Sequence, residues 1–293
     1  MKIKKFLSVV SLVLLTAFLL TGCSEKAKDD DTNKTASTPT VAPTPTTAAE
    51  KEVVVIKGIA DLVPHSELIE FVKPKLLEQG IDVQLVATSA DSTTNEKTAK
   101  GEIDFNFFQH DPYLQSENEA NGYDLVNVGD IHVEPITAYS DKYKTVNEIP
   151  DKAVVAIPND GTNEYRALII LEQNGFIKLN PETTKTLTAS LADVSEYSKK
   201  IKIIEIDSAQ IIPTKDDYDF FITNTNKALE AKITSNRLFS EGSDSPYANI
   251  IVTRKAEKDN PAILALVKEL QSAETAKFIE DKYKGAVIPA KLK

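Results

Sequence analysis

The chain has almost no cysteine. One Cys occurs in 293 residues, at position 23, so no second thiol is available for a disulfide and the region beyond it must be held together by its core. Acidic residues outnumber basic ones, 44 to 34, which argues against a nucleic-acid partner. The Gly-x-Ser-x-Gly, His-Glu-x-x-His and phosphate-loop motifs are also absent, and the region after Cys23 has no thiol nucleophile. We therefore expect a protein that is not an enzyme and needs no cofactor.

Long apolar runs are equally scarce, and the one that exists is at the N-terminus. Three lysines in the first five residues precede an apolar run over 6–20 that is too short for a stable membrane span. This pattern predicts a secretory signal over residues 1–22. The stretch Leu20-Thr21-Gly22-Cys23 resembles the lipobox of bacterial lipoproteins, which implies cleavage before Cys23, acylation of Cys23 and a lipid anchor on the extracytoplasmic face of the cell membrane. The alternative is an ordinary signal peptide with a chance Cys near its end.

Residues 23–52 have the composition of a tether. They are rich in Asp, Lys, Thr, Pro and Ala and contain almost no large apolar side chains, so they cannot bury enough surface to offset the entropy of ordering. The remaining region, 53–293, has a normal apolar content and no further run of membrane-spanning length. We expect residues 53–293 to form the folded part.

Short apolar runs alternate with amphipathic stretches along this region, which predicts an α/β fold with parallel sheets built from βαβ units. Gly80 is expected to end the first helix, and Pro74 predicts a kink or a late start in it. Strands are expected at 53–56, 83–86, 125–128, 153–157, 201–206, 218–223 and 249–253, and helices at 66–79, 163–173, 261–270 and 272–283.

Two extended segments, 132–135 and 245–249, are expected to carry the chain between two lobes. If both are crossovers, residues 53–133 with 250–293 form lobe 1 and residues 134–249 form lobe 2. A ligand cleft with a two-strand hinge then lies between the lobes.

Several blocks of sequence resemble the NlpA family of substrate-binding lipoproteins, whose best-known members bind methionine. The core block is Asn106-Phe107-Phe108-Gln109-His110-Asp111-Pro112-Tyr113, and five further blocks lie at 71–76, 132–135, 157–168, 243–250 and 285–290. The resemblance implies a periplasmic-binding-protein-like fold that closes on an amino acid. It also implies delivery of that amino acid, with methionine as the default, to an ABC importer made of a permease and an ATPase. A hinged receptor of this kind is expected to be a monomer.

The resemblance assigns a polar end of the site to Asn163, Arg166, Asn224 and Asn249. A guanidinium can hold an α-carboxylate with two parallel hydrogen bonds, and a helix N-terminus favours the same anion. We expect Arg166 to lie in a first helical turn, where an Arg is more often a surface residue when no family is considered. The asparagines can donate and accept at once, although a single Asn is more often a turn residue.

The resemblance assigns the apolar wall of the site to Phe108, His110 and Tyr113, where aromatic faces would enclose a thioether. By composition alone, Phe108 is more often a core residue and His110 a hydrogen-bonded loop histidine.

Three residues depart from the family pattern: Asp91 and Lys227 stand where the family usually has Tyr, and Tyr165 replaces a small residue beside Arg166. An unpaired carboxylate facing a thioether is costly, whereas one facing an ammonium or a hydroxyl is satisfied. The sequence therefore predicts that Asp91 belongs to the ligand site and that its side-chain end is more polar than in methionine binders. In a second interpretation, Lys227 forms an ion pair with Asp91, which would leave the side-chain end of the ligand site apolar.

Two rival functions remain at this point. A metal-transport lipoprotein would use His65, His110, His132 and Glu134 as ligands, but these residues have no short metal-ligand spacing. A surface antigen without a transport role is the other alternative. The preferred prediction, an amino-acid-binding lipoprotein, requires no metal ion.

Overall fold

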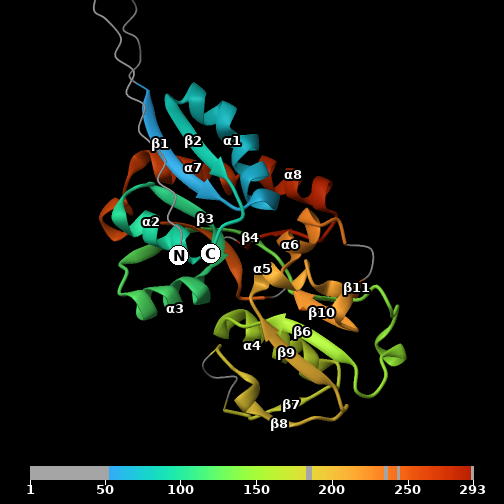
Figure 1. Cartoon of the computed structure of the whole chain (residues 1–293). Coiled ribbons are helices and arrows are strands. Elements are labelled where there is room, and N and C mark those ends of the chain that lie inside the picture. The colour runs from blue at the N-terminus through green and yellow to red at the C-terminus, as the bar shows by residue number, and fades with distance from the viewer. Residues whose placement is uncertain (1–52, 183–186, 234–236, 243–244, 292–293) are drawn as a thin grey trace, which may run out of the picture. The chain divides into compact units, whose positions relative to one another are not determined.

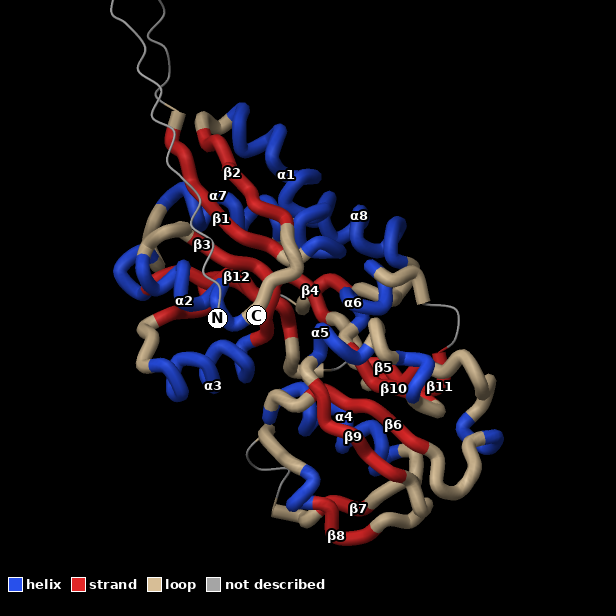
Figure 2. Tube along the Cα trace, in the orientation of Figure 1, coloured by secondary structure: helices blue, strands red, loops and turns tan. Residues whose placement is uncertain are grey.

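Two β-sheets organise the protein, which we describe from a computed structural model (Figures 1 and 2). The structure describes residues 53–182, 187–233, 237–242 and 245–291, all within one compact unit, Glu50–Lys293. The predicted signal peptide, Cys23 and the tether lie outside these residues. Within the described ranges, no helix has the length and apolar character needed to cross a membrane.

The first sheet has six strands in the order β13-β4-β12-β3-β1-β2, and the second has five in the order β11-β5-β10-β6-β9. The strands of the first sheet are β1 (Val54–Ala60), β2 (Ile81–Ala87), β3 (Phe105–His110), β4 (Leu125–Val133), β12 (Ala248–Arg254) and β13 (Ile288–Pro289). Those of the second are β5 (Thr137–Tyr139), β6 (Val154–Pro158), β9 (Lys202–Ile206), β10 (Phe220–Thr223) and β11 (Arg237–Ser240). A separate pair joins β7 (Lys178–Leu179) and β8 (Val194–Glu196).

The predicted α/β class is confirmed, but the sheets are mixed and not wholly parallel. Parallel pairing joins β1 to β2 and β3, and β6 to β9 and β10. The pairs that involve β5, β12 or β13 are antiparallel. The strands β5, β11 and β13 are only two to four residues long, too short to give a period-2 signal in the sequence.

Helices cover both faces of the first sheet (Figure 1). On one face α1 (Glu67–Glu78), α7 (Pro261–Leu270) and α8 (Ala273–Tyr283) bury apolar side chains such as Leu68, Leu266 and Ile279 in one large cluster. On the other face lie α2 (Ser92–Lys100) and α3 (Asp111–Asn121), with Leu114 of α3 in a smaller cluster. Pro74 lies inside α1 without ending it.

The second sheet is covered by α4 (Gly161–Gln173) and by the short helices α5 (Ser208–Ile211) and α6 (Thr225–Glu230). Leu168 and Leu171 of α4 pack in the main cluster of this sheet. The α6 helix contacts both sheets' cores, since Ala228 belongs to a second-sheet cluster and Leu229 packs against the first-sheet cluster. Short 3-10 or π segments connect the larger elements at Leu62–Ser66, Val146–Glu148, Leu191–Asp193, Lys215–Asp217 and Lys255–Glu257.

The two predicted crossing segments lie side by side. After Val133 at the end of β4 the chain passes to the second sheet, and it rejoins the first sheet at Ala248. In the antiparallel register, Ala248 faces Val133 and Asn249 faces His132. This pairing supports the two-strand hinge, while the boundaries proposed for the lobes, 53–133 with 250–293 and 134–249, stay a prediction.

Candidate functional site

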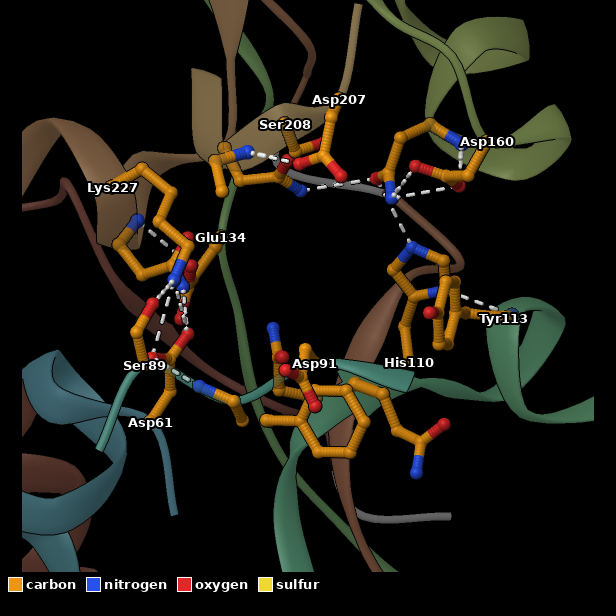
Figure 3. A pocket seen from close by; sticks show the side chains of 18 of the residues that line it. Asp61, Ser89, Asp91, His110, Tyr113, Glu134, Asp160, Asp207, Ser208 and Lys227 are labelled. Atoms are coloured by element: carbon orange, nitrogen blue, oxygen red, sulfur yellow. Dashed lines mark hydrogen bonds and ion pairs between the residues drawn. The ribbon is translucent and has the colours of Figure 1, made fainter. Parts of the chain in front are cut away.

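Five helices begin at the edge of one pocket. The residues before α2, α3, α4, α5 and α6 are Asp91, His110, Asp160, Asp207 and Asn224, and all five line a pocket of about 300 Å³ (Figure 3). Each helix follows the carboxyl end of a strand, where open α/β sheets usually bind their ligands. The local sequence explains four of these starts, because the side chains of Asp91, His110, Asp160 and Asp207 accept hydrogen bonds from backbone N–H groups of the first turn. The side chain of Asn224 makes no such bond.

The eight residues predicted to contact the ligand all line this pocket. Figure 3 labels Asp91, His110 and Tyr113 among them. The complete set is Asp91, Phe108, His110, Tyr113, Asn163, Arg166, Asn224 and Asn249. They come from segments attached to both sheets, so the pocket lies between the sheets. Their contact with a ligand stays a prediction.

The sequence did not single out several polar residues of the pocket as ligand contacts. These are Asp61, Ser89, Gln109, Glu134, Asp160, Asp207, Ser208 and Asn226. The sequence did contain a signal for three of the acidic residues. Asp61 and Asp207 each come directly after a strand, and Asp160 follows β6 by two residues. Polar residues directly after the strands of an α/β sheet face its ligand-binding edge.

Arg166 is buried, at 2% exposed, and already has a carboxylate partner. Its Nε lies 3.4 Å from Glu241 Oε1 and one terminal nitrogen lies 2.6 Å from Glu241 Oε2. That nitrogen also donates to the Glu134 carbonyl at 2.8 Å, and the guanidinium lies 4.5 Å from the ring centre of Tyr247. The expected position of Arg166 in a first turn is wrong: α4 begins at Gly161, which places Arg166 in the second turn.

The remaining terminal nitrogen of Arg166 points to Asn163, the centre of a polar network. Asn163 Oδ1 accepts from this nitrogen at 3.2 Å and from Asn224 Nδ2 at 3.0 Å. Asn163 Nδ2 donates to both oxygens of Asp160 at 3.0 Å. The network fixes Asn163 and Arg166, which both line the pocket.

His110 joins this network as a neutral imidazole. Burial and the nearby Arg166 charge lower the pKa of His110 to about 3. Its Nδ1 accepts from the Tyr113 backbone N–H at 3.2 Å, so the proton resides on Nε2, which faces Asn163 Oδ1 at 3.3 Å.

Lys227 pairs with Asp61, so the interpretation that pairs it with Asp91 is wrong. The Lys227 ammonium lies 3.0 and 3.2 Å from the two oxygens of Asp61 and 3.1 Å from Ser89 Oγ. Asp61 also accepts from Asn226 Nδ2 at 2.6 Å. Asp91 instead caps α2, accepting from the Thr93 N–H at 2.9 Å and from the Thr93 hydroxyl at 2.6 Å, and it lines the pocket.

Tyr165, the third departure from the family pattern, lies away from the main pocket. It lines a separate hollow of about 280 Å³, together with Ile169, Tyr247 and the Arg166–Glu241 pair. Its side chain therefore faces the Arg166–Glu241 pair from this second hollow.

Three residues could hold a metal ion: His65, His132 and Glu134 are buried, and their ligand atoms all lie within 4.8 Å of one another. His110 is not part of this cluster. Glu134 Oε1 lies 2.7 Å from His132 Nε2 and 3.6 Å from His65 Nε2. Burial lowers the pKa of His132 to about 3, and burial also lowers the pKa of His65 and raises that of Glu134. The imidazoles are thus neutral, the form that binds metals, but they also hydrogen-bond within the cluster, with His65 Nε2 3.0 Å from Asn249 Oδ1.

Comparisons with known proteins agree on one family. A curated relative, the probable D-methionine-binding lipoprotein MetQ of Pasteurella multocida, is 37% identical over 290 residues, 98% of this chain and 99% of the relative. A nutrient-binding protein from Burkholderia cenocepacia solved with methionine bound has a TM-score of 0.76 at 36% identity, covering 80% of this chain and 100% of that one. An ABC transporter periplasmic substrate-binding protein from Coxiella burnetii has a TM-score of 0.75 at 33% identity, with 80% and 100% covered. The sequence model of the NlpA lipoprotein family matches residues 57–291, and the chain belongs to this family.

Proposed function

We propose that the protein is the substrate-binding component of an ABC importer. It is anchored to the extracytoplasmic face of the membrane through acylated Cys23, binds an α-amino acid between its two sheets and delivers it to the permease. Methionine is the reference ligand, because the relatives that carry a ligand in their names are methionine binders. The protein acts by binding and release and has no catalytic role.

One observation carries the proposal: Arg166 and Asn163 line the same pocket as His110 and Asn249. The first two belong to α4 on the second sheet, and the other two end β3 and begin β12 in the first sheet. A ligand in the pocket touches both halves of the protein. Arg166 has one N–H left beyond its bonds to Glu241, the Glu134 carbonyl and Asn163. The α-carboxylate would accept from this N–H near the N-terminal end of α4, where positive charge and N–H groups favour an anion.

A ligand that contacts both halves couples its binding to rotation of the halves about the hinge. It favours the closed arrangement by the difference between its affinities for the closed and open forms. The paired segments of β4 and β12 are the strands about which the halves would rotate. The closed form is then the one that the permease recognises.

The geometry favours a small-molecule site over the metal alternative. Of the three clustered residues, only Glu134 lines the pocket, and each of the three already has a hydrogen-bond partner within the hinge region. We interpret His65, His132 and Glu134 as a buried hydrogen-bond network that orients the hinge strands and Asn249.

Titration calorimetry tests the proposal. Purified wild-type protein, freed of bound ligand by unfolding and refolding, is titrated with methionine and the other common amino acids. We expect at least one to bind in the micromolar range or tighter, and Arg166→Lys to weaken it by about tenfold or more, because an ammonium keeps the charge but loses the planar fork.

Arg166→Lys is preferred to Arg166→Ala because removal of the guanidinium would leave Glu241 as an unpaired, largely buried carboxylate. Lys142→Met, at an exposed ion pair with Asp219 on the second sheet, is the control and should bind as wild type does. Failure of every amino acid to bind the folded wild-type protein would reject the proposed function.

A further inference from the structure

The pocket at the proposed amino-acid site contains a surplus of negative charge. Five of its lining side chains are carboxylates and only two, Arg166 and Lys227, are cationic. His110 adds no charge near neutral pH, because its pKa is lowered to about 3 by burial and by Arg166. An amino acid with an uncharged side chain is a zwitterion without net charge, so it cannot offset this surplus.

The two cations are already neutralised by the protein. Lys227 contacts both oxygens of Asp61. Arg166 pairs with Glu241, which does not line the pocket. Neither cation is therefore free to compensate the other carboxylates.

Two of the remaining carboxylates, Glu134 and Asp160, also have hydrogen-bond partners within the protein. Glu134 is buried, burial raises its pKa, and it contacts His132 and the Asn226 backbone N–H. Asp160 accepts hydrogen bonds from Asn163 and Thr162 at the start of α4.

Asp91 and Asp207 can accept further hydrogen bonds. Each uses one oxygen on a helix start, at 2.9 Å from the Thr93 N–H and 2.8 Å from the Ala209 N–H. In the part of the chain that the structure describes, neither forms an ion pair with a lysine or arginine. A helix N-terminus offsets at most about half a charge, and α5, which Asp207 caps, is only four residues long.

These two carboxylates lie on facing sides of the pocket (Figure 3). Tyr113 is near both: burial first, and then the charges of Glu117, Asp160, Asp91 and Asp207, raise its pKa, so its hydroxyl stays protonated. Asn226 also lines the pocket, where its side-chain amide donates to Asp61 Oδ2 at 2.6 Å. Asp91 and Asp207 are thus two exposed carboxylates that line the pocket without a cationic partner among the described residues.

We propose that the ligand is a cationic amino acid whose side-chain ammonium or guanidinium lies between Asp91 and Asp207, while its α-carboxylate contacts Arg166 and Asn163. This inference rests on the proposed amino-acid-binding function and names the class of amino acid. It places the specificity of the site in two residues that cap helices on opposite sides of the pocket.

The test compares amino acids that differ in one group. Calorimetry at pH 7 measures the affinities of L-lysine, L-ornithine and L-arginine against those of L-norleucine, which is lysine without its ε-ammonium, and L-methionine. The variants are Asp91→Asn and Asp207→Asn, because Asn caps helices about as well as Asp and so keeps the fold. Asp259→Asn, at an exposed carboxylate outside the pocket, is the matched control.

We expect at least one cationic amino acid to bind at least tenfold more tightly than norleucine. Each pocket variant should weaken it by about tenfold to a hundredfold, the range for a hydrogen bond to a charged group. Norleucine should change by less than about threefold and Asp259→Asn should behave as wild type. The affinity of the cationic ligand should also fall as salt is raised, since opposite charges are screened.

Two outcomes would overturn this inference and leave the proposed function standing. In the first, norleucine or methionine binds more tightly than all three cationic amino acids. In the second, the pocket variants weaken norleucine and lysine equally, which would assign the carboxylates to the α-ammonium. If no amino acid binds the folded protein, both the inference and the proposed function are rejected.

Discussion

At the scale of single residues, burial has shifted the protonation of Glu164, a residue of α4 outside the ligand pocket. Glu164 is 4% exposed, and burial, together with a hydrogen bond to and the charge of Glu205, raises its pKa from 4.5 to about 8. The folded protein therefore keeps a proton that the unfolded chain releases above about pH 4.5. The contribution of Glu164 to stability is full below that pH and is lost as the pH rises to 8.

We predict that the melting temperature of the wild-type protein falls between pH 6.5 and 8 and that Glu164→Gln reduces this fall, the remainder coming from Glu117, Glu134 and Glu230, whose pKa values are also raised. The buried histidines His110 and His132 do not contribute there: their pKa values of about 3 make stability drop only as the pH falls below about 6.5. Thermal unfolding followed by circular dichroism across this range is the measurement. Equal slopes for wild type and variant would contradict the assignment.

At the scale of elements, the position of β1 against β3 depends on a glycine. Gly58 of β1 lies opposite Phe105 of β3 in the parallel register, and a Cβ at this position would come within 2.2 Å of the Phe105 ring. Phe105 is fully buried in the first-sheet core. The close approach of these strands fixes the end of β3, from which Phe108 and His110 reach the pocket.

Gly58→Ala should lower the free energy of unfolding by about 1–3 kcal/mol, the usual cost of forcing extra volume into a packed core. Chemical denaturation monitored by tyrosine fluorescence gives this number. Gly161→Ala is the control at the first residue of α4, where an added Cβ would meet its nearest neighbour at an ordinary 3.9 Å. A Gly58→Ala protein as stable as the control would show that β1 does not need this contact.

At the candidate site, some features of the helices and strands can be predicted from the local sequence and others cannot. Helix starts are local features, so Asp160 can be recognised as a cap from its position before the amphipathic stretch of α4. Asp91 could not, because residues 92–100 are almost wholly polar. The short antiparallel strands β5 and β11 could not be predicted, because their pairing depends on a partner far along the chain and their length gives no periodicity.

At the scale of the whole molecule, α6 connects the two halves. Its Ala228 packs in a second-sheet cluster and its Leu229 against the first-sheet core. The adjacent Lys227 binds Asp61, at the end of β1, with both side chains largely buried. This ion pair therefore joins the two halves in the structure.

We predict that Lys227→Met opens the ligand-free protein and increases its radius of gyration in small-angle X-ray scattering. Because Lys227 also lines the ligand pocket, the scattering curve and not the ligand affinity is the readout of closure. Lys142→Met removes an exposed ion pair with Asp219 and should leave the scattering curve unchanged. A Lys227→Met protein with the wild-type scattering curve would mean that the ion pair does not control closure.

The sequence by itself determined the α/β class, most of the long helices and strands, the family and the eight candidate ligand contacts, because these depend on local periodicity, caps and short motifs. Only the tertiary structure decided the charge partners. Arg166 pairs with Glu241, 75 residues away, and Lys227 with Asp61, 166 residues away. Such pairs form only when folding brings distant segments together in a buried place, where a charge must find its partner. Among the described residues, these pairs leave Asp91 and Asp207 as pocket carboxylates without a cationic partner.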